Sequence, residues 1–209
     1  MLMFILALLV LCGNVIAFRP QPCCLPNQHQ YYVQRIAGNA NATNWTNPAA
    51  VIPQEEEFWE YYDSDNNREA VVKTIHDQNG RLHTVRSVNF YNEFISYTVN
   101  MTTGICTKTR LRDGSGLISV CIPDNATLVE STDVGSPTNS MATHTWAWTD
   151  GIASVRGIFT AKDCMILMDG WYFNTGKIAR VVTNIYTNYH PGIVDQSVFN
   201  LAGYNCPMS

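Results

Sequence analysis

Residues 91–111, YNEFISYTVNMTTGICTKTRL, carry the clearest strand pattern in the chain. Apolar and polar side chains alternate in the first half, with Glu93 and Phe94 as exceptions. The predicted apolar face of this half consists of Tyr91, Ile95, Tyr97 and Val99. A turn signal at residues 101–104, MTTG, follows, and the alternation resumes over 105–111. Because period-two alternation around a short glycine-containing turn is typical of a β-hairpin, the segment predicts two antiparallel strands.

Similar short alternating runs occur on both sides of this hairpin. They are Arg68–His76, Leu117–Ile122, Thr143–Thr149, Ser154–Thr160, Trp171–Phe173 and Lys177–Tyr186. Gly, Asp and Asn separate several of them, which indicates an all-β, mainly antiparallel sandwich or barrel. Only residues 195–199 predict a short C-terminal helix, with Asp195 as its N-cap.

The N-terminus predicts a signal peptide over residues 1–17, with cleavage after Ala17. Its apolar run breaks at Gly13 and Asn14, well short of the roughly 20 residues that span a bilayer. A membrane anchor is the alternative, because no Lys or Arg precedes the run. Residues 18–209 are enough for one domain with its own core.

Composition excludes several classes of protein. Hydrophobic residues make up 46% and charged residues 14% of the chain, which excludes a disordered chain and a coiled coil. The formal net charge of −4 gives no electrostatic reason to expect a nucleic acid as partner.

Six of the seven cysteines follow the predicted signal peptide: Cys23, Cys24, Cys106, Cys121, Cys164 and Cys206. An even number in a secreted chain favours a disulfide framework, although six cysteines allow 15 pairings and the spacing does not choose among them. Cysteine-bound zinc is not favoured, since no C-x-x-C motif occurs.

Four Asn-x-Thr acceptors predict N-linked glycans. They begin at Asn41, Asn44, Asn100 and Asn125. Together with a signal peptide they indicate a glycoprotein, and a glycan requires its asparagine to lie on the surface.

The sequence lacks the usual motifs of hydrolases and nucleotide-binding enzymes. No G-x-S-x-G, H-E-x-x-H or P-loop occurs, and the five histidines are scattered. We therefore expect no enzymatic activity and no organic cofactor.

Residues 63–67, DSDNN, place Asp63 and Asp65 at alternate positions, as in the first half of a calcium loop. Arg68 stands where the EF-hand requires Gly, and no Glu closes the loop at its twelfth position. A polar hairpin turn is therefore the favoured interpretation, and a calcium site the alternative.

Aromatic side chains on the predicted strands form a candidate ligand pocket. They are Phe94, Tyr97, Trp146, Trp148, Phe159, Trp171 and Phe173. A well-filled core is the usual arrangement of such residues, whereas a half-open barrel would turn them into a concave site for a lipid-like molecule. Composition does not separate these two interpretations.

Several segments, taken in order, resemble the ependymin-related proteins. These are Pro22-Cys23 to Pro26, Tyr62-Asp63 with Asn67-Arg68, residues 103–106 (TGIC), 122–127 (IPDNAT), 148–150 (WTD), 160–164 (TAKDC), 195–199 (DQSVF) and Cys206. No single segment is specific, but together they cover nearly the whole of residues 18–209.

The resemblance implies two curved, stacked antiparallel sheets that form a half-open barrel, like the bacterial lipoprotein carriers, around a deep apolar pocket. It also implies a homodimer, calcium binding, a secreted or lysosomal location and a role in cell-matrix adhesion. For the cysteines it implies a disulfide from Cys23 or Cys24 to Cys164 and another from Cys106 to Cys206. We expect Cys121, which the family pattern lacks, to pair with the remaining member of Cys23 and Cys24.

The function expected is that of a secreted glycoprotein that binds a lipid or other apolar ligand between its sheets. The alternative is a component of the extracellular matrix or cell surface with calcium-dependent interactions and no small-molecule ligand.

Overall fold

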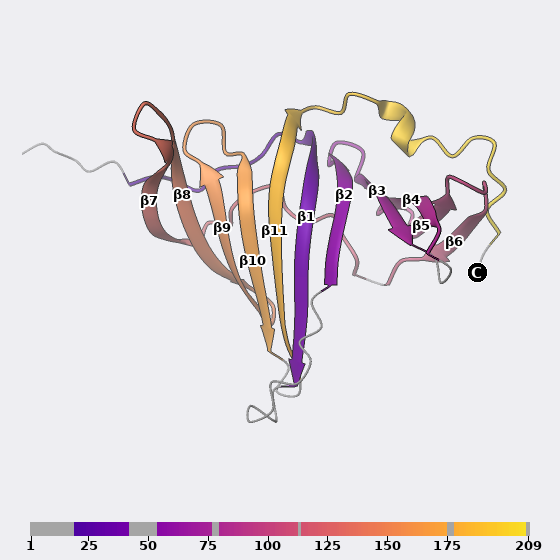
Figure 1. Ribbon diagram of the computed structural model, residues 1–209, viewed down its shortest axis with the longest axis horizontal. Helices are drawn as coiled ribbons and strands as arrows, with labels where there is room; N and C mark the ends of the chain where they lie inside the picture. The colour runs from indigo at the N-terminus through magenta and orange to yellow at the C-terminus, as the bar shows by residue number, and fades with distance from the viewer. Residues whose placement is uncertain (1–18, 42–53, 77–79, 113, 175–177, 208–209) are drawn as a thin grey trace, which may run out of the picture.

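A computed structural model describes residues 19–41, 54–76, 80–112, 114–174 and 178–207 (Figure 1). The described part of the chain contains eleven strands and one short 3-10 turn, η1 (Gln196–Phe199). The strands are β1 (Gln28–Asn41), β2 (Gln54–Asp63), β3 (Arg68–His76), β4 (Leu82–Phe90), β5 (Ile95–Asn100), β6 (Cys106–Arg110), β7 (Thr127–Ser136), β8 (Asn139–Asp150), β9 (Ala153–Thr160), β10 (Ile166–Asn174) and β11 (Ile178–Pro191). No helix among the described residues has the length and apolar character needed to cross a lipid bilayer.

All eleven strands belong to one antiparallel sheet in the order β6-β5-β4-β3-β2-β1-β11-β10-β9-β8-β7. Each half is a meander of neighbouring hairpins, and the two halves join where the long strands β1 and β11 pair. The all-β, antiparallel prediction is confirmed. The structure refines it, because hydrogen bonding continues from one half into the other and the sheet is not closed into a barrel.

The hairpin at residues 91–111 is confirmed. Tyr97 lies opposite Lys108, and Val99 lies opposite Cys106, in the antiparallel pair β5 and β6. The first strand begins only at Ile95, because Tyr91 and Phe94 belong to the turn after β4. Phe94 has a φ of 54°, a backbone conformation that residues other than glycine rarely adopt.

Two predicted elements differ from the structure in detail. The segment 117–122 alternates like a strand, but it forms only an isolated bridge between Cys121 and Cys24. The predicted C-terminal helix is the single turn η1, whose N-cap is Asp195 as expected, with its carboxylate accepting a hydrogen bond from the Ser197 N–H at 2.9 Å. This single turn is enough to bury Val198 and Phe199 against the sheet.

The chain covers the two faces of the sheet differently. On one face the C-terminal segment packs Val198 and Phe199 against Ala70 and Val88. The guanidinium of Arg86 holds this segment by donating to the carbonyl oxygens of Ser197 and Asn200. Figure 1 shows the segment running along one end of β2 to β6.

On the other face, which we call the cavity face, the residues before β1 and the segment 118–122 cover β8 and β9. Leu25 and Ile122 are buried there against Trp146 and Phe159. The two covering segments are joined by hydrogen bonds of 2.9 Å, from Leu25 N to Val120 O and from Ile122 N to Cys23 O.

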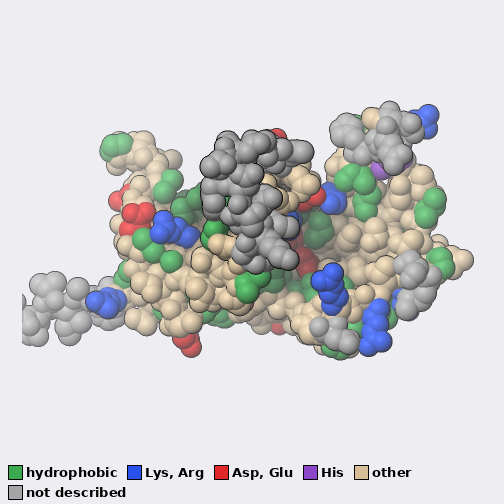
Figure 2. Space-filling model, turned by 90° about the horizontal axis from the view of Figure 1, so that it is seen from below, with side chains coloured by type: hydrophobic (Ala, Val, Ile, Leu, Met, Phe, Trp, Pro, Cys, Tyr) green, Lys and Arg blue, Asp and Glu red, His purple; other side chains and the backbone are tan. Residues whose placement is uncertain are grey.

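Three disulfides fasten these coverings: Cys23–Cys164, Cys24–Cys121 and Cys106–Cys206. Cys23–Cys164 and Cys106–Cys206 are disulfides that the family resemblance implies, and Cys24–Cys121 is the pairing expected for the additional cysteine. The first two hold the covering of the cavity face, and the third ties the C-terminal segment to β6. Figure 2 shows the surface hollowed near the middle of the molecule, with hydrophobic and acidic side chains inside the hollow.

Candidate functional site

A cavity of about 340 Å³ lies between the cavity face and its covering. The sheet contributes residues from β1, β2, β8, β9, β10 and β11, and the covering contributes Leu25 and residues 118–122. Its wall divides into an apolar part and a polar part, which are built by different strands.

The apolar part is aromatic. Trp171 and Phe173 alternate along β10 and therefore point to the same face, where their rings stack at 6.1 Å between centroids and 12° between planes. Trp148 and Phe159 line the cavity from β8 and β9, beside Ile166 and Val182. Four of the seven aromatic residues in the sequence-based pocket thus surround one cavity.

The other three aromatic residues of the predicted pocket do not line this cavity. Trp146 is buried among Leu25 and Ile122 beneath the covering and belongs to the core. Tyr97 packs edge-on against Phe90 with Lys108 over its ring, and Phe94 is 40% exposed in its turn. Their alternation resembled that of the lining residues, but strand order places β5 at the far side of the sheet from β8 to β10.

The polar part of the wall centres on Asp169, which is 5% exposed. Its two carboxylate oxygens accept hydrogen bonds from the Asn184 amide and the Tyr186 hydroxyl, both at 2.7 Å. Burial raises the pKa of Asp169, although the two hydrogen bonds oppose this shift. The same burial raises the pKa of Tyr186 well above its usual value.

Glu60 on β2 is the second acid of this polar part. One of its oxygens accepts a hydrogen bond from the Tyr31 hydroxyl at 3.0 Å, and its other oxygen has no hydrogen-bond partner within the described ranges. Burial, reinforced by the negative charge of Glu69, raises the pKa of Glu60 to about 8. At neutral pH the carboxyl is therefore largely protonated and offers a hydrogen-bond donor to the cavity.

Arg35 completes the polar wall from β1. Its Nε donates to the Asn184 side chain at 2.9 Å, and its guanidinium lies over the Phe58 ring and 3.7 Å from Glu56. Glu56 also pairs with Lys73 at 3.1 Å, so Arg35 shares this carboxylate with a second cation. The wall as a whole can hydrogen-bond the polar end of a ligand whose apolar part contacts the aromatic side.

Sequence reasoning missed this polar wall. The alternation of Tyr31, Val33 and Arg35 was a usable signal, because it places a tyrosine and an arginine on the buried side of one strand. Glu60 and Asp169 gave no such signal in the sequence, because strand pairings between distant segments bring them into the same wall.

Histidine and tyrosine fix the covered end of the cavity. His29 donates a hydrogen bond from Nδ1 to the Pro26 carbonyl oxygen at 2.8 Å, and its ring stacks on Tyr62 at 4.8 Å. Burial lowers the pKa of His29, and this favours its neutral form. The Tyr62 hydroxyl donates to the Ile118 carbonyl oxygen and so fastens the covering segment to β2.

The two candidate calcium ligands lie in the turn between β2 and β3. The buried Asp63 accepts hydrogen bonds from Gln28, Asn66 and Arg68, while Asp65 accepts one from Asn27. Burial alone would raise the pKa of Asp63, but the bonds from Asn66 and Arg68 lower it. Calcium takes six to eight oxygen ligands, and a guanidinium 2.7 Å from one oxygen fits a structural turn better than a calcium site.

No group of three or more His, Cys, Asp or Glu side chains with metal-binding geometry occurs in the part of the chain that the structure describes. Calcium binding therefore stays a prediction from the family resemblance.

The glycan acceptors are only partly within the described residues. Asn100 is the last residue of β5, and its side-chain oxygen accepts hydrogen bonds from the Thr102 and Thr103 N–H groups of the following turn. Asn125 is exposed in the turn before β7. The side chain of Asn41 and all of Asn44 lie outside the described residues.

The comparison with models of known protein families identifies one family. The model of the Ependymin family matches residues 79–203, which include β4 to β11 and η1. A search of curated proteins found no match. The fold is similar to the crystal structure of an uncharacterized conserved protein from Thermus thermophilus, with 11% identity, 97% of this chain and 98% of that chain covered, and a TM-score of 0.44. A likeness this weak carries no functional argument.

Proposed function

Because the chain belongs to the ependymin family, whose members are secreted extracellular glycoproteins, we propose that it is a secreted glycoprotein that binds an amphiphilic, lipid-like ligand in its cavity. The apolar part of the ligand contacts Trp171 and Phe173, and its polar end forms hydrogen bonds with Glu60. Secretion is further supported by the three disulfides, which persist in oxidising compartments.

The observation that carries this proposal is the division of one cavity wall into an aromatic part and a polar part. A purely apolar wall would fit the interior of a closed core as well as a binding site. Polar groups cost free energy when they are buried, so a wall that retains an acid with a free oxygen favours a ligand that reaches it.

The size of the cavity limits the ligand. A volume of about 340 Å³ lies at the lower end of the roughly 300–1,000 Å³ typical of small-molecule sites. We therefore propose a single-chain amphiphile, or one chain of a larger lipid.

Lipid extraction and native mass spectrometry of protein purified from secreting cells test the proposal. We expect a stoichiometric amphiphile in the extract and a mass shift that disappears on delipidation. A protein that keeps its native fold, carries no ligand and takes up no single-chain lipid would contradict it.

Neighbouring valines on β11 offer a matched pair of variants. Val182 lines the cavity, and Val181 points to the opposite face, where it is 50% exposed. We expect Val182→Trp to fill the cavity and to weaken binding of a fluorescent single-chain lipid by at least about tenfold, the loss of ~1.4 kcal/mol. Val181→Trp should leave binding unchanged. Equal binding by the two variants, with both folded by circular dichroism, would place the ligand elsewhere.

The homodimer, calcium binding, a lysosomal location and matrix adhesion are further expectations from the family resemblance. Adhesion predicts binding to collagen or cells that is lost on chelation, with the cavity variant Val182→Trp unaffected. That result separates the matrix function from the carrier function.

A further inference from the structure

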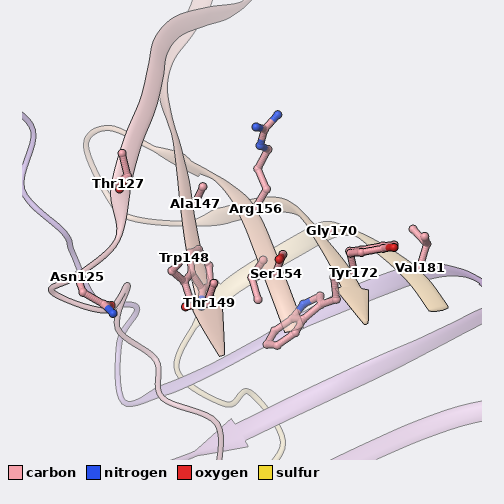
Figure 3. A pocket seen from close by; sticks show the side chains of 12 residues that line it. Asn125, Thr127, Ala147, Trp148, Thr149, Ser154, Arg156, Gly170, Tyr172 and Val181 are labelled. Atoms are coloured by element: carbon pink, nitrogen blue, oxygen red, sulfur yellow. The ribbon is translucent and has the colours of Figure 1, made fainter. Parts of the chain in front are cut away.

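A second hollow, of about 680 Å³, lies at the side of the sheet where β8 to β11 run next to one another. Most residues that line this groove lie on the face opposite the covering, among them Thr127, Ser154, Arg156, Tyr172 and Val181. Trp148, Val155 and Trp171, which belong to the cavity face, line it as well. Asn125, a predicted glycan acceptor, lines it too. Figure 3 shows Asn125 and Thr127 at one end of the groove and Tyr172 and Val181 at the other.

Strand register explains the shape of the groove. One cross-strand row contains Thr127, Ala147, Arg156 and Gly170, which lie opposite one another in successive pairs. The next row contains Thr149, Ser154, Tyr172 and Val181. Small side chains at Ala147 and Gly170 leave a trough along the first row, and a Cβ added to Gly170 would meet nothing within 4 Å.

The lining has the chemistry that binds sugar rings. Sugars present faces of C–H groups, which pack on aromatic rings, and hydroxyl groups, which exchange hydrogen bonds with hydroxyl and guanidinium groups. Tyr172 is 40% exposed and offers a ring, while Thr149, Ser154 and Arg156 offer polar groups on the same face.

A glycan attached to Asn125 is the occupant that fits this groove. Its side chain is exposed and forms no hydrogen bond with another residue of the described part of the chain, so its amide nitrogen is free to carry a glycan. A glycan attached there begins inside the groove. Covalent attachment holds it at a high effective concentration, so that weak contacts are enough to keep it in place.

We propose that the N-linked glycan of Asn125 folds back along this groove and packs against Tyr172 and Arg156. The inference rests on the proposed secretion and glycosylation and is independent of any ligand in the cavity. The glycan covers an apolar part of the sheet that the chain itself leaves exposed, including Val181.

Site-resolved deglycosylation tests the proposal. Protein secreted from eukaryotic cells is treated with peptide-N-glycosidase in heavy-oxygen water, and labelled aspartate at each site is followed by peptide mass spectrometry. Native release at Asn125 should be about tenfold slower than release at the same site in denatured protein, which corresponds to ~1.4 kcal/mol of packing. Release at Asn100, at the end of β5 beside an exposed turn, should change much less on denaturation.

Groove variants separate specific packing from general crowding. Tyr172→Ala and Arg156→Ala should each accelerate native release at Asn125, whereas Val134→Ala, on the exposed β7–β8 hairpin, should not. An unoccupied Asn125, or native release that is as fast as denatured release, would overturn the proposal. So would slow release that neither groove variant accelerates. A protein with a protected Asn125 glycan and an empty cavity would keep this inference while refuting the proposed carrier.

Discussion

Replacing both Cys23 and Cys164 by serine is expected to lower the free energy of unfolding by about 2–5 kcal/mol and to release the cavity ligand. The disulfide joins the segment before β1 to the turn after β9, 141 residues away along the chain. Without it the unfolded chain gains conformational freedom. In the folded state the segment around Leu25 loses one of its two disulfide attachments over the cavity.

Urea unfolding and native mass spectrometry on the same samples measure both effects. The variant Cys106→Ser with Cys206→Ser is the control, since this disulfide closes a loop of comparable length but ties down the C-terminal segment instead. The control should lose stability by a similar amount and retain the ligand. Equal ligand loss in the two variants would show that the covering of the cavity face has no special role in retaining the ligand.

Glu60→Gln is expected to change how stability depends on pH. The pKa of Glu60 is raised from 4.5 to about 8 in the folded protein, so between these values the folded state holds a proton that the unfolded state has released. Wild-type stability should therefore fall as pH rises through this window, by on the order of 1 kcal/mol per pH unit from this group. The glutamine variant loses this contribution, because its neutral amide still accepts the Tyr31 hydrogen bond and never ionises.

Urea unfolding from pH 4.5 to 8.5 checks this prediction. We expect the two proteins to be similar at the acidic end and the variant to be more stable by a few kcal/mol near pH 8. The difference between the proteins cancels the contributions of His29 and Asp169, which both retain. Glu55→Gln, at an exposed position of the same strand, should behave like wild type. A pH profile of Glu60→Gln that is parallel to wild type would mean that Glu60 is ionised and solvated.

The hairpin at 91–111 was predictable because its pattern is local. Apolar and polar residues alternate along its sequence, and a glycine-containing turn separates the two runs. The joining of the two halves was not predictable in this way. Arg35 meets Asn184 across 149 residues, and neither neighbourhood carries a signal for the other. The sheet therefore extends through β1 and β11 where only separate runs were visible.

The aromatic part of the site was easier to predict than the polar part. Trp171 and Phe173 stand out because large rings at alternate positions of a strand must share a face. Asp169 stands directly before Gly170, and Glu60 follows the acidic residues Glu55 to Glu57, so that neither stands out in the sequence as a buried side chain. Asp169 and Glu60 are buried because residues of neighbouring strands pack beside them. The segment 117–122 shows the converse case, since its strand-like pattern belongs to the covering, where Ile122 is buried against the sheet.

Covalent mapping of a bound lipid shows directly whether the cavity is the binding site. A single-chain lipid with a photoreactive group in its chain is bound to the delipidated, disulfide-intact protein, irradiated, and located by peptide mass spectrometry. We expect labels on β10 around Trp171 and Phe173 and on the covering segment 118–122, reduced in Val182→Trp and unchanged in Val181→Trp. Labels confined to the opposite face, around Val181 and Tyr172, would contradict the assignment of the cavity as the binding site.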